Sequence, residues 1–455
     1  MTGGPVDRSV RPPPGPPRPL VLPSFERLEG PGGLRVEHAP RAGVPEVSLR
    51  LVIEAGACGE PADRAGLAEL TSRLLTEGTA DRDAIAMARW VDRLGVGFDA
   101  SAGYAVTILS MHALTDVLED ALGFLAAVVR DPTFPGREVE RIRSERIDEI
   151  ERDLDEPSRV AGHALIAALY GDALYGRPIG GTAPTVSAIG SDDVRRFHAD
   201  RFRPGESLLV ACGDVEPRRL EAAIARAFGD WSGVAARPAP TDTPAAPPAR
   251  TILIDRPGSP QAEVRVGTIG VPYGTEAHYA TVVANAILGG LFNSRINMNL
   301  REEKGWTYGA RSGFRFRRGA GPFVVQTAVE TAVTADAFGE ILREIEMMRE
   351  DLVSPAELDL AKHALTLSLP LQFETAAHIT RRVSRQRIYD LPEDYWERYR
   401  ERIDAVTAEE VREACRARLA REGLTLLAVT DADAVAAELE RFGEVERRTI
   451  AESTS

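Results

Sequence analysis

Cysteine is nearly absent from the 455 residues, and the three that occur, Cys58, Cys212 and Cys415, are far apart. Their odd number and wide spacing exclude a disulfide scaffold and a cysteine-based metal motif, and they favour a reducing compartment. The proline-rich start has no apolar core of the length that a secretion signal needs. No run approaches the ~18 apolar residues of a membrane span. We therefore expect a cytoplasmic protein with no part in a membrane.

Histidine is also scarce, and no two histidines lie within five residues of each other. The seven are His38, His112, His163, His198, His278, His363 and His378. A helical zinc site needs two ligands one turn apart, so that both imidazoles face one ion. The sequence also lacks a Gly-x-Ser-x-Gly elbow, a Walker loop and a catalytic Cys/His spacing. We expect no metal and no other cofactor in this chain.

Positive charge is in deficit. The chain has 55 Lys and Arg against 69 Asp and Glu, which gives a net charge of -14, and no basic block occurs. This balance argues against nucleic acid and anionic membranes as partners. A basic or neutral polypeptide is the more plausible partner.

The length predicts at least two domains, and a segment rich in proline, alanine and threonine marks the boundary. We predict a flexible arm over 1–22, an α+β domain over 23–236, a linker over 237–250, a second α+β domain over 251–447 and a tail over 448–455.

The two halves resemble each other. SDDVRRFHADRFRPGESLLVACGD aligns with AEEVREACRARLAREGLTLLAVTD, which places Val194 on Val411 and, with one gap, Gly205 on Gly423. We predict two duplicated α+β domains, each a mainly antiparallel sheet covered by helices. The alternative is two unrelated α+β domains of similar composition.

The segment AGLAELTSRLLTEGT (65–79) predicts an amphipathic helix that ends near Gly78. Leucines at helical spacing form its apolar face. Its other face carries three polar residues about one turn apart: Glu69, Ser72 and Arg73. Periodicity alone predicts an ordinary surface helix.

A second segment, GGLFNSRINMNLREEKGWTYGARS (289–312), predicts a short helix capped by Asn293 and ended by Gly305. Arg301 falls in its last turn, and Tyr308 is predicted to begin the following strand. A guanidinium and a phenol could both donate hydrogen bonds to peptide carbonyls. The spacing alone is equally compatible with an arginine at a helix end and an ordinary strand tyrosine.

This second segment resembles the second domain of the pitrilysin/insulin-degrading-enzyme family of zinc peptidases, in the branch that contains mitochondrial processing peptidase and bacterial two-chain relatives. The resemblance extends over nearly the whole chain and implies that it forms half of a clamshell. Family members carry an Arg/Tyr pair at this spacing, which lies across a closed chamber from the zinc and helps to hold the substrate. The resemblance assigns that role to Arg301 and Tyr308.

The resemblance also reinterprets the first helix. Active members carry a pattern like GLAHFLEHMLFKGT where this chain has GLAELTSRLLTEGT. The two zinc histidines then correspond to Glu69 and Arg73, and the catalytic glutamate to Ser72. The best counterpart of the third ligand, a glutamate on a later acidic helix, is Glu149. A serine is no general base at its ordinary pKa, and Arg73 would repel a dication.

The resemblance therefore implies a non-catalytic, substrate-binding subunit of a heterodimeric zinc metallopeptidase. A homologous partner would supply HxxEH and zinc, and the substrate would be a peptide or an unfolded chain; removal of a leader peptide is one option. An inactive structural or binding homologue with no peptidase partner is the alternative. A self-contained enzyme with an unusual site is the weakest reading.

Overall fold

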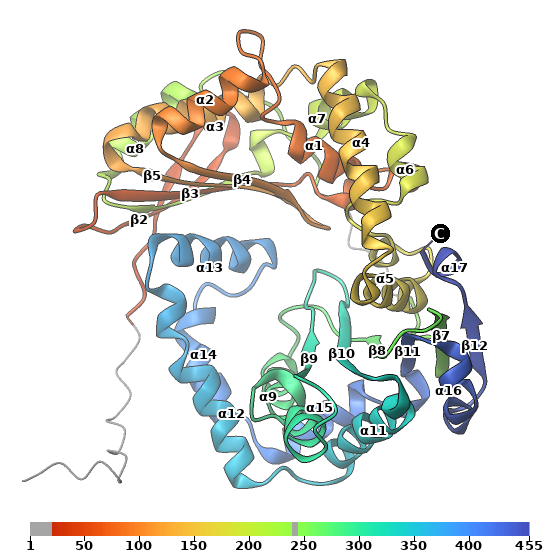
Figure 1. Ribbon diagram of the computed structural model, residues 1–455. Helices are drawn as coiled ribbons and strands as arrows, with labels where there is room; N and C mark the ends of the chain where they lie inside the picture. Colours follow the sequence, from red (N-terminus) through yellow and green to blue (C-terminus); the bar gives the residue numbers. More distant parts are fainter. Residues whose placement is uncertain (1–20, 239–243, 455) are drawn as a thin grey trace, which may run out of the picture.

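The computed structural model describes residues 21–238 and 244–454, which form two halves, each with its own six-stranded sheet (Figure 1). Most of the predicted arm and five residues of the predicted linker lie outside the described residues. The first sheet has the order β1-β2-β6-β3-β5-β4. Its strands are β1 (Glu26–Glu29), β2 (Arg35–Pro40), β3 (Glu46–Ile53), β4 (Gly97–Ala102), β5 (Thr107–Leu114) and β6 (Leu208–Gly213).

The second sheet has the order β12-β7-β11-β8-β10-β9. Its strands are β7 (Arg250–Asp255), β8 (Gln261–Ile269), β9 (Ala310–Phe314), β10 (Pro322–Glu330), β11 (Thr425–Thr430) and β12 (Val445–Arg448). Five successive positions of the two sheets match in direction: β2 is parallel to β6 as β7 is to β11, and the remaining neighbours are antiparallel. The edge strands differ: β1 comes first in its half and is antiparallel to β2, whereas β12 comes last in its half and is parallel to β7. The predicted duplicated α+β fold is confirmed.

The helices divide between the halves. Those of the first half are α1 (Leu67–Leu74), α2 (Ala84–Leu94), α3 (Leu118–Arg130), α4 (Gly136–Asp153), α5 (Pro157–Tyr170), α6 (Ala183–Ser187), α7 (Ser191–Arg201) and α8 (Pro217–Phe228). Those of the second half are α9 (His278–Asn285), α10 (Arg295–Asn297), α11 (Thr334–Glu350), α12 (Pro355–Leu367), α13 (Ala376–Ile388), α14 (Tyr395–Ala405), α15 (Ala408–Arg418), α16 (Ala432–Leu439) and α17 (Ile450–Thr454). None of these helices is both long enough and apolar enough to cross a membrane.

The duplication extends to single residues. Val194 is the fourth residue of α7 and Val411 the fourth residue of α15, and both side chains are fully buried. Gly205 and Gly423 each lie in a short 3-10 turn that leads into the central strand of their half. Each half therefore contains an equivalent unit made of a helix, a 3-10 turn and a central strand.

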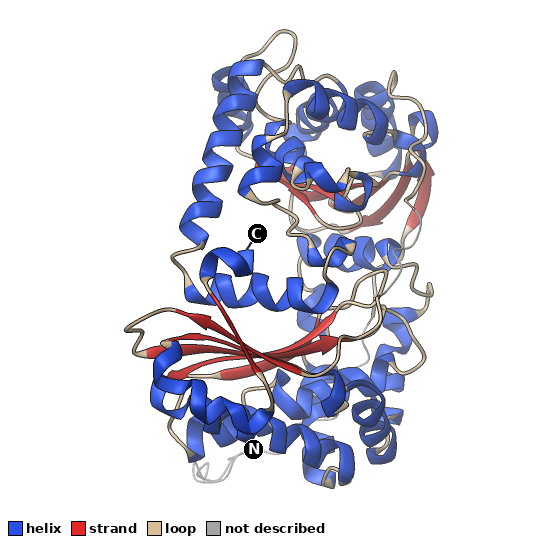
Figure 2. Cartoon of the chain, turned by 90° about the vertical axis from the view of Figure 1, so that its right-hand side faces the viewer, coloured by secondary structure: helices blue, strands red, loops and turns tan. Residues whose placement is uncertain are grey.

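One helix from each half packs on the sheet of the other half. Helix α5 of the first half packs on β8 and β11 of the second sheet, whereas α13 of the second half packs on β3 and β6 of the first (Figure 1). Figure 2, seen from the side of α4 and α5, shows helices on both faces of the lower sheet. This exchange explains why β6 (LLVACG) and β11 (TLLAVT) are buried at every position, because apolar contacts cover both faces of these strands.

Candidate functional site

Helix α1 keeps a well-defined start. Its N-cap is Gly66 with φ of 101°, a left-handed conformation that favours glycine. The Glu60 carboxylate accepts the N–H groups of Gly66 at 3.1 Å and Ala68 at 2.9 Å. Burial raises the pKa of Glu60 to about 7, although those N–H donors oppose the shift. With its leucines in the core, α1 is held rigidly against the first sheet.

The structure brings three of the four predicted residues of the altered zinc site into contact. Arg73 Nε donates to Glu69 Oε1 at 2.9 Å, and Arg73 Nη1 donates to Glu149 Oε1, also at 2.9 Å. Glu149 on α4 accepts a further bond from Arg146 Nη1 at 2.9 Å, and Arg146 Nε donates to the Gly180 carbonyl at 3.0 Å. A guanidinium therefore bridges α1 and α4 between the two carboxylates.

This network is electrically balanced, with two carboxylates and two guanidinium groups. The hydrogen bond from Arg73 is the largest cause that lowers the pKa of Glu149, and the same bond raises the pKa of Arg73. The ion pair between Arg73 and Glu149 therefore stays charged around neutral pH. Sequence reasoning missed Arg146, although its position three residues before Glu149 on a helix is a usual ion-pair spacing.

These residues do not fit a zinc ion. The cation bound between Glu69 and Glu149 is already Arg73, and the Ser72 hydroxyl, which is buried, donates to the Glu69 carbonyl of its own helix at 2.8 Å. Across residues 21–238 and 244–454, no group of three or more His, Cys, Asp or Glu side chains could hold a metal ion. The site therefore presents no base to activate a zinc-bound water and no set of ligands to hold a zinc ion.

The second predicted pair lies in the other half, and two local expectations about it are wrong. The cap of α10 is Ser294 rather than Asn293, and the helix continues as a π-helical turn over Met298–Glu303. Strand β9 begins at Ala310, so Tyr308 lies in the loop before it. The Asn297 amide ties the two elements together: it donates to the Phe292 carbonyl at 2.7 Å and accepts the Ala310 N–H at 3.0 Å.

Tyr308 projects from this loop and is 96% exposed. The loop itself is ordered, because the Gly309 N–H donates to Thr307 Oγ1 at 3.1 Å and Thr307 in turn bonds to Thr327 of β10 at 2.9 Å. Arg301 ends over the ring of Phe292, 4.6 Å from its centroid, and its Nε lies 3.5 Å from Glu302 Oε1. No hydrogen bond or ion pair joins Arg301 or Tyr308 to the Arg73 network in the part of the chain that the structure describes.

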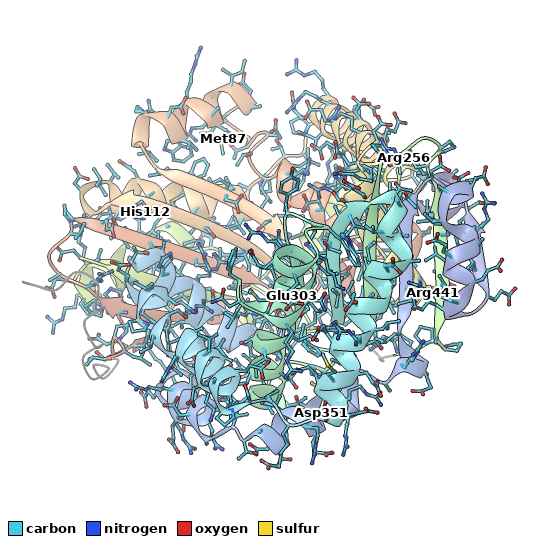
Figure 3. The ribbon with its side chains drawn as sticks, turned by 60° about the horizontal axis from the view of Figure 1, so that its bottom comes forward. Met87, His112, Arg256, Glu303, Asp351 and Arg441 are labelled. Carbon is cyan, nitrogen blue, oxygen red and sulfur yellow. The ribbon has the colours of Figure 1, made fainter. Side chains whose placement is uncertain are left out.

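The segment that carries Arg301 is tied to α12. Arg295 Nε donates to Glu357 Oε1 at 2.6 Å, and Glu357 also forms a capping box with Ser354 at the start of α12. Burial alone would raise the pKa of Glu357, but hydrogen bonds from Arg295 and Ser354 lower it to about 2. Figure 3 shows the end of the segment, labelled Glu303, amid the charged side chains of the lower half.

Replacing Glu357 by glutamine is expected to make the chain less stable at neutral pH, because Arg295 loses its carboxylate. The folded pKa is depressed from 4.5 to about 2, so this contribution is complete above pH 4.5 and is lost as the pH falls toward 2. Urea denaturation at pH 7, 5 and 3 should show a difference between wild type and Glu357→Gln that shrinks with acid. Glu409→Gln, in the exposed first turn of α15, is the matched control and should change little. A difference independent of pH would contradict the assignment.

Two family models match the chain in sequence. Residues 36–183 match the insulinase family, peptidase family M16, and residues 188–365 match the peptidase M16 inactive domain. An uncharacterized zinc protease of Mycobacterium leprae is 28% identical over 385 residues, which cover 84% of this chain and 86% of the relative. A relative from Streptomyces coelicolor with the same description is 26% identical and covers 88% of each chain.

The solved structures agree with the family models. The crystal structure of a peptidase M16 inactive domain from Pseudomonas fluorescens superposes with a TM-score of 0.83 at 26% identity and covers 89% of this chain and 98% of that one. The resemblance to zinc peptidases of the pitrilysin type is thereby confirmed. Since the two matched segments together span most of residues 36–365, the chain belongs to peptidase family M16, the insulinase family.

Proposed function

We propose that this chain is the non-catalytic, substrate-binding subunit of a two-chain zinc metallopeptidase. The observation that carries the proposal is Tyr308, a tyrosine 96% exposed on a loop that backbone and threonine hydrogen bonds hold in place. A phenol presented in this way, with no bond to its own chain in the described residues, is available to a ligand. Arg301 lies within the same ordered segment, about seven residues earlier in the chain.

In this proposal a homologous partner with HxxEH holds the zinc and the attacking water. Tyr308 donates to the carbonyl oxygen of the bond that is cut, where negative charge develops in the transition state. Arg301 donates to neighbouring backbone carbonyls and so fixes the register of the peptide. The peptide binds as an extended strand added to a sheet edge, which reads the backbone more than the side chains. Substrates are peptides or unfolded chains.

The Arg73 network supports an assembly in which this chain binds substrate and the partner carries out catalysis. A guanidinium fixed between Glu69 and Glu149 leaves no place for a catalytic dication, so the metal chemistry belongs to the other chain. The three cysteines are unpaired in the structure, which supports our placement of the assembly in the cytoplasm.

An inactive structural role is the second candidate. A chain of complex III2 from Candida albicans shares the fold with a TM-score of 0.76 at 15% identity, so the fold also occurs in an assembly of another kind. A purely structural role would not explain why Tyr308 is exposed on a loop that hydrogen bonds hold in place. The two candidates differ in whether an HxxEH partner exists.

The test is reconstitution. The chain is mixed with the product of a neighbouring reading frame of similar length that contains HxxEH, and cleavage of unfolded polypeptides is followed by mass spectrometry. We expect the mixture to cleave, a chelator to stop it, and this chain alone to be inactive. Chelator-sensitive cleavage by this chain alone would overturn the proposal, as would a partner whose rate is unchanged when this chain is added.

A further inference from the structure

A cavity of about 400 Å³ lies where the two halves meet, between α5, β8, β10 and the loop after β9. Five arginines line it, and no aspartate or glutamate does: Arg146, Arg159, Arg265, Arg315 and Arg317. This is the reverse of the chain as a whole, whose net charge is -14. Local charge, rather than net charge, decides which groups bind in a cleft.

Part of this positive charge is already neutralised. Arg146 pairs with Glu149 of the network described above, Arg265 Nη1 lies 2.8 Å from Glu263 Oε2, and Arg159 Nε lies 3.9 Å from Asp153 Oδ1. In the described residues, Arg315 and Arg317 have no carboxylate within ion-pair distance. The cavity therefore keeps an excess of unpaired guanidinium groups.

Arg317 is held in place without a charged partner. Its guanidinium carbon lies 4.1 Å from the ring centroid of Tyr104 and 4.5 Å from that of Tyr175. Both rings are themselves fixed, because the Tyr104 hydroxyl donates to the Arg177 carbonyl and the Tyr175 hydroxyl accepts the Gly319 N–H. Arg317 Nη1 is buried and has no hydrogen-bond partner among the residues that the structure describes. A buried charged donor without an acceptor is costly, and an anion would satisfy it.

The site continues along the edge of the second sheet, where Arg311 joins Arg315. Strand β9 is the last in the sheet order, so no strand of the described chain pairs with its outer edge. Arg311 pairs in register with Gln326, which lines the cavity, and therefore lies on the same face of the sheet. Arg315 is four residues further on and shares that face, at a distance of about 13 Å along an extended strand. Arg311, Arg315 and Arg317 together form the β9 arginine cluster.

We propose that the β9 arginine cluster binds the carboxylates of an acidic segment in an extended peptide, so that acidic peptides are the substrate class of this subunit; this rests on the function proposed above. Guanidinium groups about 13 Å apart exceed the reach of a single small anion, but they match side chains on one face of an added strand. Tyr308 precedes Arg311 by three residues and Arg315 by seven. With Arg317 nine residues after Tyr308, the acidic residues should therefore lie about three to nine residues from the bond that is cut.

The test measures binding to the whole chain without a partner. A short fluorescein-labelled peptide carries three glutamates spaced four and two residues apart, which is the spacing of the cluster, and a matched peptide carries glutamines instead. Fluorescence polarisation at low ionic strength should give about tenfold tighter binding of the glutamate peptide, because charged hydrogen bonds are the strong ones. Arg311→Gln/Arg315→Gln should remove most of that preference. Both residues lack ion pairs in the described chain, so the fold should survive, as circular dichroism can verify.

The matched control is Arg89→Gln/Arg218→Gln, which removes the same charge from exposed positions on α2 and α8. Equal affinity for the two peptides, or an equal loss in the control variant, would overturn the inference. Inorganic phosphate or a peptide with one glutamate that competes as well as the full peptide would also overturn it. Failure of reconstituted cleavage alone is a different result: it would remove the peptidase function and leave the measured preference for carboxylates intact.

Discussion

Replacing Tyr308 by phenylalanine is expected to slow peptide cleavage by the reconstituted two-chain enzyme by about 10²- to 10³-fold, the usual effect of losing one donor to a developing oxyanion. The phenol is 96% exposed in this chain, so the variant should fold and melt like wild type. The loss should fall on kcat, because the hydrogen bond strengthens as charge develops on the carbonyl oxygen.

Arg301→Ala should behave differently. Its donors are expected to hold peptide carbonyls equally in the ground state and in the transition state, so KM should rise more than kcat falls. Tyr279→Phe, which removes a hydroxyl on α9, and Arg89→Ala, on the outer α2, are the matched controls and should leave both constants unchanged. If Tyr308→Phe and Arg301→Ala left the rate of the mixture at the wild-type value, the substrate-holding role would be wrong.

The second large effect is a gain of metal binding. Wild type should bind no zinc at this site, whereas Glu69→His/Ser72→Glu/Arg73→His should bind one zinc ion per chain. The reason is geometric: Arg73 Nη1 lies 2.9 Å from Glu149 Oε1, so α1 and α4 already lie close enough for side chains of both helices to bind one zinc ion. Two imidazoles one turn apart on α1, with Glu149 Oε1 released by the loss of Arg73, form a three-ligand zinc site, while Arg146 still holds Glu149 Oε2.

Zinc content by mass spectrometry and thermal melting with and without zinc would measure this gain. Free zinc at about 1,000 times its Kd should stabilise the variant by about 4 kcal/mol, and wild type should show no such shift. Adding Glu149→Gln to the triple variant should weaken binding strongly, because it removes the third ligand. One equivalent of zinc on wild type, or none on the triple variant, would contradict the account of the Arg73 network.

Much of the fold follows from local pattern. The alignment of Val194 with Val411 predicts the duplication, and both valines occupy the same position of equivalent helices. The capping box that Ser354 and Glu357 form is a local pattern of the same kind. Such features are readable because capping and helical periodicity depend on residues a few positions apart. The Arg301/Tyr308 spacing and the altered zinc helix are likewise visible in the sequence, although their roles remain predictions.

Contacts between distant segments were decided by the tertiary structure alone. No periodicity reveals that α5 and α13 each pack on the sheet of the other half, because a helix with an apolar face can pack on either sheet. Glu149 reads as a solvated helix carboxylate until α4 is placed beside α1, where it meets Arg73. The β9 arginine cluster is equally hidden, because only strand register places Arg311 on the face of the cavity. The sequence by itself determined the family and the absence of a zinc motif; long-range packing decided what now occupies that site and where the positive charge gathers.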